Sequence, residues 1–253
     1  MANVLPKEKQ LAVVQLLVEG NSVRSISRIT GVNLRTCLRI LVKVGNACRN
    51  LLDERMRDLH LRHVQCDEIW TYVAKKQHRV PVGESRENPL IGDQFVFVAL
   101  DTDTKLIATY AIGKRTADLT RRFLMDLSRR LVLPKPYMTD YDRHVEVPQI
   151  STDGFGPYPE AVDLAFGGYV KFGTIVKDYR NATMPYTPSE IVGSKRRGVY
   201  GIEEHEVRTI CTSHVERSNL TIRTFIRRFT RLTLGFSNST VGSRIAACKR
   251  FWY

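Results

Sequence analysis

The chain has 253 residues, of which 43% are hydrophobic, and it carries a formal net charge of +13. No apolar run approaches the roughly 20 residues of a membrane span, and the polar start Met1–Gln10 lacks the apolar core of a signal peptide, so a membrane protein is disfavoured. The five cysteines form no Cys-x-x-Cys pair, which disfavours a disulfide framework and a zinc ribbon. Basic side chains are in excess in residues 1–62 and 195–253, which favours a cytoplasmic, nucleoid-associated protein that binds a polyanion such as DNA.

Residues 1–62 are predicted to form an all-α domain. Ser22 and Asn33 are suited to begin the second and third helices, and Gly31 lies in the turn between them. This order matches a helix-turn-helix, although a plain three-helix bundle with a solvated basic face is the alternative. The expected helices are Pro6–Glu19, Val23–Ile29 and a third that runs from Leu34 through a connector to about Met56.

The third helix carries a basic face that could enter a major groove. Arg35, Arg39 and Lys43 recur every four residues, and Asn33 and Thr36 lie near the helix start. The apolar residues expected to face inward in the three helices and the connector are Leu11, Val14, Leu17, Val18, Val23, Ile26, Ile29, Leu34, Leu38, Leu41, Val42, Leu51 and Leu52.

The stretch His63–Ala74 reads as a central strand, because β-branched and aromatic residues dominate it and apolar residues fall on both faces. Asp67 and Glu68 lie in its middle. A buried carboxylate is costly unless a cation or hydrogen-bond donors compensate it. A metal ion would compensate the buried charge. Alternatively, one carboxylate points to solvent at a strand end and the other pairs with an arginine.

The remaining elements predict an α/β fold with a sheet of mixed direction, without the glycine-rich loop of a nucleotide site. Long polar stretches, Lys75–Gly92 and Lys177–Gly201, read as loops. The expected strands are Asp93–Leu100, Leu106–Ile112, Gln149–Thr152 and Tyr169–Val176, and the expected helices are Ala117–Leu131, Pro157–Phe166 and Thr212 to about Leu234.

Two further carboxylates lie at element boundaries. Asp153 follows a strand, where α/β sheets bind ligands, although Asp-Gly is also a common turn. Glu216 lies in the first turn of the last helix, where Ser213 and Glu216 fit a capping box that would by itself explain both. Asp67, Asp153 and Glu216 could instead converge, and three carboxylates could hold two hard divalent cations for phosphodiester chemistry.

Several collinear blocks resemble the DDE transposases of bacterial and archaeal insertion sequences, of the insertion-sequence-one type. The resemblance runs from the helix-turn-helix to about Ser237. The matching blocks are Val64–Trp70, Thr152–Gly154, Ala161-Val162 with Phe166-Gly167, Gly193–Arg197, His214–Thr221 and Arg227–Thr233.

This resemblance implies a ribonuclease-H-like catalytic domain over residues 63–236, with Asp67, Asp153 and Glu216 as catalytic ligands of two Mg²⁺ or Mn²⁺ ions. It also implies that metal-activated water cleaves the DNA at the element's inverted repeats and that the freed 3′-hydroxyl then attacks target DNA. A homo-oligomer would hold the double-stranded DNA in a synaptic complex. Glu68 is expected to be no ligand, because adjacent strand residues point to opposite faces. The residues expected to contact DNA are Asn33, Arg35, Thr36, Arg39, Lys43, Lys195, Arg196, Arg197, Arg217, Asn219, Arg223, Arg227 and Arg231.

Residues 237–253 depart from this family, since they lack its lysine-rich amphipathic segment. A frameshift or truncation would produce such a tail, and we expect it to impair transposition. The alternatives to an active transposase are a helix-turn-helix regulator with an inert ribonuclease-H-like domain and a structure-specific nuclease of the same fold.

Overall fold

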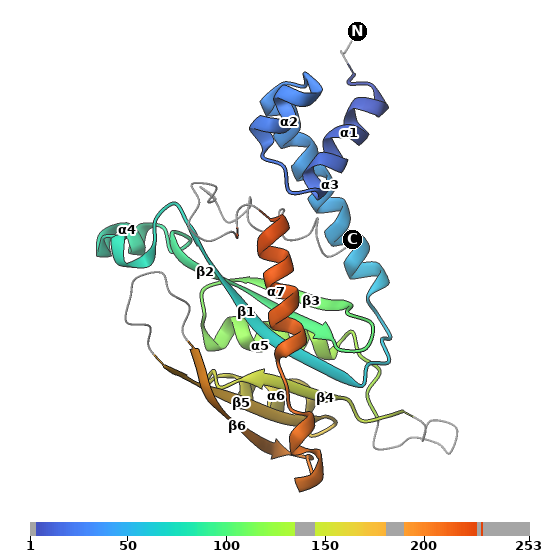
Figure 1. Ribbon diagram of the computed structural model, residues 1–253, viewed down its shortest axis with the longest axis vertical. Coiled ribbons are helices and arrows are strands. Elements are labelled where there is room, and N and C mark those ends of the chain that lie inside the picture. The colour runs from blue at the N-terminus through green and yellow to red at the C-terminus, as the bar shows by residue number, and fades with distance from the viewer. Residues whose placement is uncertain (1–3, 135–144, 181–189, 227–228, 230–253) are drawn as a thin grey trace.

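The computed structural model describes residues 4–134, 145–180, 190–226 and 229. Within them, a six-stranded sheet carries helices on both faces, and three N-terminal helices stand beyond one of its edges (Figure 1). The mixed α/β class is the predicted one. The helices are α1 (Lys7–Val18), α2 (Val23–Thr30), α3 (Leu34–Arg55), α4 (Val82–Glu87), α5 (Ala117–Ser128), α6 (Tyr158–Phe166) and α7 (Ser213–Phe225). The strands are β1 (His63–Val73), β2 (Gly92–Asp101), β3 (Ile107–Gly113), β4 (Gln149–Asp153), β5 (Lys171–Arg180) and β6 (Glu190–Tyr200).

The three N-terminal helices begin where their capping residues predict. The Ser22 side chain accepts a hydrogen bond from the Ser25 N–H, and the Asn33 side chain accepts one from the Arg35 N–H. Gly31 ends α2 in the left-handed conformation, with φ of 68°, which a glycine adopts without a steric penalty. Helix α3 continues as one long helix toward the sheet (Figure 1).

The prediction of the inward-facing residues of these helices is partly wrong. Cys37 and Leu41 are the buried residues of α3 in the small helical core, whereas Leu34, Leu38 and Val42 are exposed. Both sets recur every four residues, so the sequence alone does not decide which set packs inward. The other expected core residues that are instead exposed are Leu11, Ile29 and Leu51.

The sheet has the strand order β3-β2-β1-β4-β5-β6, with β1 near its centre. Strands β1, β2 and β3 are antiparallel neighbours, β4 runs parallel to both β1 and β5, and β6 returns antiparallel to β5. This arrangement is consistent with the ribonuclease-H-like fold that the sequence resemblance implies.

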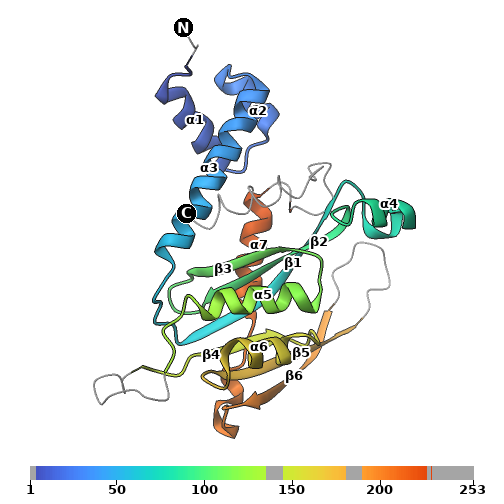
Figure 2. The ribbon, with the colours of Figure 1, turned by 180° about the vertical axis from the view of Figure 1, so that it is seen from behind.

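The two faces of the sheet are covered by different helices. Helices α5 and α6 pack on one face, where residues such as Phe97, Leu124 and Tyr158 form the larger core (Figure 2). Helix α7 crosses the other face, where Ile69, Val215 and Ile222 share a second core with Leu52 of α3. The central strand is therefore buried on both sides, as its apolar residues predict.

A buried arginine joins the long helix α3 to the sheet's helical layer. Arg130, which follows α5, donates hydrogen bonds to the carboxylates of Asp126 and Asp53 and to the carbonyl oxygens of Leu52 and Met56. Because its charge has two carboxylate partners, its burial is compensated. This contact attaches the end of α3 firmly to α5.

Three of the predicted element boundaries are wrong. Lys75–Gly92 contains a short 3₁₀ turn, η1 (Gln77–Arg79), and α4 rather than a continuous loop. Lys177–Gly201 is not a loop, because β5 extends to Arg180 and pairs with β6. Helix α5 ends at Ser128 rather than Leu131.

The predicted last helix is also shorter than expected, since α7 ends at Phe225. The tail assigned to residues 237–253 lies outside the described residues. Among the helices of the described part, none combines the length and the apolar character that a membrane crossing requires.

Candidate active site

Two of the predicted carboxylates lie side by side on the α7 face of the sheet. In the parallel pair of β1 and β4, Gln65 is opposite Ser151. Two residues further along each strand come Asp67 and Asp153, which therefore point to the same face. Asp153 is the last residue of β4, so its side chain stands at the strand end while β1 continues beyond Asp67.

Asp67 is half-buried and has few hydrogen-bond donors. The Asn219 amide of α7 donates to its Oδ2 atom at 2.8 Å. Burial raises the pKa of Asp67 to about 6, and the charges of Asp153 and Glu216 add to this rise. A carboxylate with a raised pKa beside other acidic groups is poised to accept a cation.

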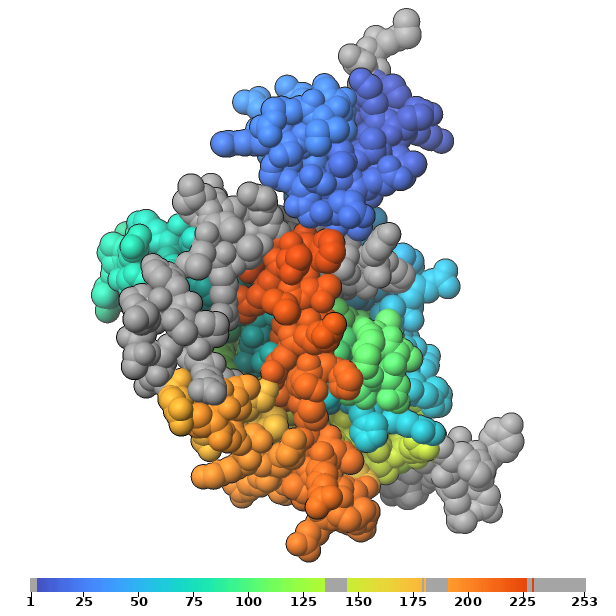
Figure 3. Space-filling view, viewed as in Figure 1, coloured from blue at the N-terminus to red at the C-terminus, as the bar shows by residue number. Residues whose placement is uncertain are grey.

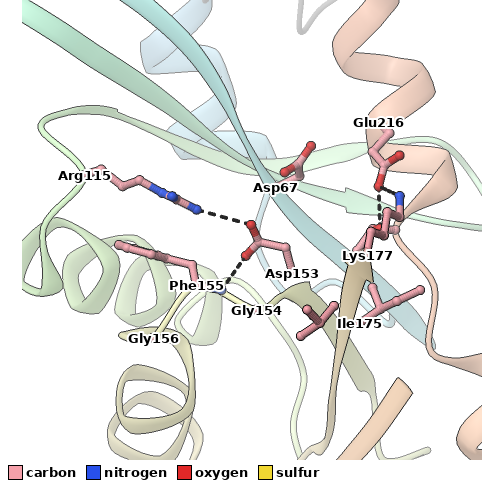
Figure 4. Close-up of a pocket in the computed structure, with 11 residues that line it drawn as sticks. Asp67, Arg115, Asp153, Gly154, Phe155, Gly156, Ile175, Lys177 and Glu216 are labelled. Atoms are coloured by element: carbon pink, nitrogen blue, oxygen red, sulfur yellow. Dashed lines mark hydrogen bonds and ion pairs between the residues drawn. The ribbon is translucent and has the colours of Figure 1, made fainter. Parts of the chain in front are cut away.

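Asp153 is held by its own turn and by an arginine. The Phe155 N–H donates to its Oδ1 at 3.0 Å, and Arg115 donates to its Oδ2 at 3.2 Å. The Arg115 guanidinium also lies 3.9 Å from the centroid of the Phe155 ring, in a cation–π contact. These two contacts fix the direction of the Asp153 carboxylate at the end of β4 (Figure 4).

Glu216 reaches the same place from the first turn of α7. The side-chain oxygen of the buried Gln65 accepts hydrogen bonds of 3.0 Å from the backbone N–H groups of His214 and Val215. This bond caps the helix and docks it on β1. The predicted capping box of Ser213 and Glu216 is therefore wrong: the Glu216 carboxylate instead accepts from Thr212 Oγ1 at 2.6 Å and pairs with Lys177.

Glu68 lies on the opposite face of β1, as the alternation of strand residues predicts. Its side chain is only 3% exposed and accepts hydrogen bonds from the Tyr158 hydroxyl at 2.6 Å and from Arg115 at 2.9 Å. Burial raises its pKa to about 7, with a further contribution from the charge of Asp153, while Tyr158 and Arg115 oppose the rise. Tyr158 and Arg115 therefore offset part of the cost of burying Glu68.

Oxygen atoms of Asp67, Glu68 and Asp153 nevertheless all lie within 4.8 Å of one another. Glu216 lies outside this group but faces the same cavity of about 580 Å³, together with Asp67, Asp153, Arg115 and Lys177 (Figure 4). A second cavity of about 360 Å³ shares Asp67 and Glu216 and is also lined by Glu68, Asn219, Leu220 and Arg223. Asp67 and Glu216 thus line both cavities.

The residues expected to contact DNA are distributed over three regions. On the N-terminal helices, Asn33, Arg35, Arg39 and Lys43 are exposed and Thr36 is half-buried. On α7, Arg217 is exposed and Arg223 is half-buried at the second cavity. Arg227 and Arg231 lie outside the described residues.

The basic run of β6 is divided between two faces. Arg196 is opposite Ile175, which pairs with Asp153, so it points to the face that carries the site. It donates to the carbonyl oxygen of Ile210 at 2.8 Å. Lys195 and Arg197 point to the other face, so the three side chains do not act as one cluster.

Asn219, which was expected to contact DNA, lies close to the carboxylates. It is 5% exposed, lines the second cavity, and donates from its amide nitrogen to Asp67. Its contact with DNA stays a prediction.

Sequence reasoning missed four residues of the site. Gln65 shares the strand face of Asp67, and this spacing could have drawn attention to it. Arg115, Tyr158 and Lys177 reach the carboxylates from distant parts of the chain, and no local pattern marks them.

No protein-family model and no curated protein matches the chain. Among solved structures, it is similar to the Mos1 strand transfer complex (16% identity, 66% of this chain and 58% of that chain, TM-score 0.25) and to a Mos1 transposase paired-end complex with the left transposon end (15%, 66% and 59%, TM-score 0.25). A pre-cleavage Mos1 transpososome overlaps it at 12% identity and a TM-score of 0.30, over 100% of this chain and 79% of that chain.

These similarities are weak, and the first two span less than two thirds of the matched chains. At such TM-scores they carry no argument about residues or activity. What the site can do must be argued from its own geometry.

Proposed function

We propose that the protein is a transposase-like polynucleotidyl transferase that cleaves and joins DNA strands with divalent metal ions. One observation carries the proposal: Asp67, Asp153 and Glu216, from two neighbouring strands and a helix start, face one open cavity on the same side of the sheet. Their order along the chain and the sequence blocks around them agree with the DDE transposases of the insertion-sequence-one type.

The donor set fits Mg²⁺ or Mn²⁺. The candidate ligand atoms of Asp67, Asp153 and Glu216 are carboxylate oxygens, which hard divalent cations prefer, and the cluster that Asp67 and Asp153 form with Glu68 also consists of carboxylates. Asp67 and Asp153 would hold the metal together, with Glu216 as the third ligand from α7. Bound ions of this kind activate a hydroxyl nucleophile and stabilise the charge on the leaving oxygen in phosphodiester displacement.

The surrounding residues keep the ligands in place for this chemistry. Asn219 directs the Asp67 carboxylate, Arg115 and the Phe155 N–H direct Asp153, and Gln65 fixes the helix that carries Glu216. Such support matters because a ligand displaced by about an ångström loses much of its effect.

We further propose that helices α2 and α3 act as a helix-turn-helix, within a DNA-binding domain of residues 1–62 that precedes the catalytic domain of residues 63–236. The exposed Arg35, Arg39 and Lys43 on α3 would face the duplex, with Asn33 and Thr36 at the helix start. The substrates would be the terminal inverted repeats of a mobile element and target DNA, held by a homo-oligomer.

A strand-transfer assay tests the proposal. The full chain is incubated with precut element-end DNA, a supercoiled target and Mg²⁺, and joined products are measured. We expect joining by the natural chain and none by the Asp153→Ala variant. Binding without metal-dependent cleavage would instead identify a regulator with an inert second domain, and cleavage without joining would identify a nuclease.

A further inference from the structure

The Glu216 carboxylate already has a cation. Its Oε1 atom pairs with the Lys177 ammonium and accepts the Thr212 hydroxyl hydrogen bond. The Lys177 side chain is the more buried partner, at 15% exposed against 42% for Glu216. An ammonium that is largely removed from water depends on its carboxylate partner for stabilisation.

The end of β4 explains why Lys177 stands in the cavity. Strand β4 stops at Asp153, which pairs with Ile175 of β5, whereas β5 continues to Arg180. Lys177 lies two residues beyond Ile175 and therefore on the same face, at a level where β4 no longer flanks β5. Figure 4 shows the Lys177 ammonium next to the Glu216 carboxylate, while the Asp153 carboxylate turns toward Arg115.

The carboxylates around the cavities differ in their partners. Glu68 and Asp153 share Arg115, and Glu216 pairs with Lys177, while Asp67 accepts hydrogen bonds from uncharged donors, the Asn219 amide and the Glu68 backbone N–H. Asp67, Glu68 and Asp153 form the cluster whose oxygens lie within 4.8 Å of one another, and Glu216 lies outside it. Lys177 is therefore the cation next to Glu216, as Arg115 is the cation next to Asp153.

We propose that Lys177 is a positioning residue that holds Glu216 in the cavity and competes with a divalent ion for it. This inference rests on the proposed function. Because Lys177 and Thr212 both bind Oε1, a divalent ion that takes this oxygen must displace the ammonium, and one that takes Oε2 meets its positive charge nearby. Lys177 thereby keeps the third ligand in the cavity and lowers the affinity of the site for a divalent ion.

The test is a calorimetric titration of the full chain with Mn²⁺, without DNA. Removing the charge in Lys177→Met should tighten Mn²⁺ binding about fivefold, because a partly buried ion pair no longer has to be broken. Lys177→Arg keeps the cation and should retain the natural affinity. Lys171→Met is the matched control: Lys171 lies on the same strand and pairs with Glu206, away from the cavity, so its loss should leave Mn²⁺ binding unchanged.

A double variant separates competition for Glu216 from a general effect of charge. In a Glu216→Gln background, Lys177→Met should tighten Mn²⁺ binding no further. An equal gain in that background, or unchanged or weaker binding in Lys177→Met alone, would overturn the inference. The proposed function is tested separately by Asp67→Asn, and it fails if this variant binds Mn²⁺ as tightly as the natural chain.

Discussion

The two faces of strand β1 carry the same chemical group in different surroundings. On the α6 face, Glu68 is nearly inaccessible and accepts hydrogen bonds from Tyr158 and Arg115. On the α7 face, Asp67 accepts hydrogen bonds from uncharged donors, the Asn219 amide and the Glu68 backbone N–H, and open cavities lie beside it. A buried carboxylate paired with an arginine already has a cation, whereas one with uncharged donors can still accept one.

The largest expected difference between the faces is in catalysis. Asp67→Asn should lower metal-dependent strand transfer by about a thousandfold or more, since losing a metal ligand removes several kcal/mol of transition-state stabilisation. Glu68→Gln should lower it less than about tenfold, because an amide can still accept from Tyr158. Single-turnover strand transfer measures both. If Glu68→Gln cost as much as Asp67→Asn, Glu68 would have to be counted among the ligands.

The next difference is in stability. Tyr158→Phe should destabilise the fold by about 2 kcal/mol, because it removes a hydrogen bond to a buried charged group. Urea unfolding of the metal-free protein measures the change in the free energy of unfolding. Tyr169→Phe is the control, since Tyr169 is exposed and should change that free energy by less than about 0.5 kcal/mol. Equal changes in the free energy of unfolding for the two substitutions would show that the Tyr158–Glu68 hydrogen bond does not stabilise the fold.

A smaller effect should depend on pH. The pKa of Asp67 is raised from 3.8 to about 6, so the folded state binds a proton that the unfolded state has released between these values. The stabilising contribution of the protonated group is complete below about pH 4 and is lost as pH rises through 6. Asn at position 67 does not titrate. We therefore expect Asp67→Asn to gain on the order of 1 kcal/mol of stability relative to the natural chain between pH 4 and pH 7 without metal.

That prediction is checked by chemical unfolding of both chains at several pH values. A gain that is constant across this range would contradict the idea that Asp67 is buried at a cost. Mg²⁺ should reduce the gain at pH 7, because a ligand that binds only the folded state stabilises it.

The sequence predicted the starts of the N-terminal helices and the central strand, but not which face of α3 packs inward. The β1 stretch could be interpreted correctly because its apolar residues alternate onto both faces, which indicates a strand in the middle of a sheet. Asp153 was recognisable because it follows a predicted strand. On α3 the apolar residues fall on two neighbouring stripes, one with Cys37 and Leu41 and one with Leu34 and Leu38, and only packing decides between them.

Other features could not be predicted because they depend on residues far apart in the chain. The stretch with Lys195 and Arg197 is polar enough to read as a loop, yet it pairs as an edge strand with β5. The contacts of Arg115 with Glu68 and Asp153 join three elements that have no common sequence pattern. Identifying carboxylates was thus possible from sequence, whereas telling which of them already had partners required the structure.

Anomalous diffraction from crystals of the protein soaked in Mn²⁺ tests the central claim most directly. The account predicts a Mn²⁺ peak between the carboxylates of Asp67 and Asp153 on the α7 face, and its loss in Asp67→Asn. A peak bound by Glu68 on the Tyr158 side, or no peak at either face at saturating Mn²⁺, would contradict it.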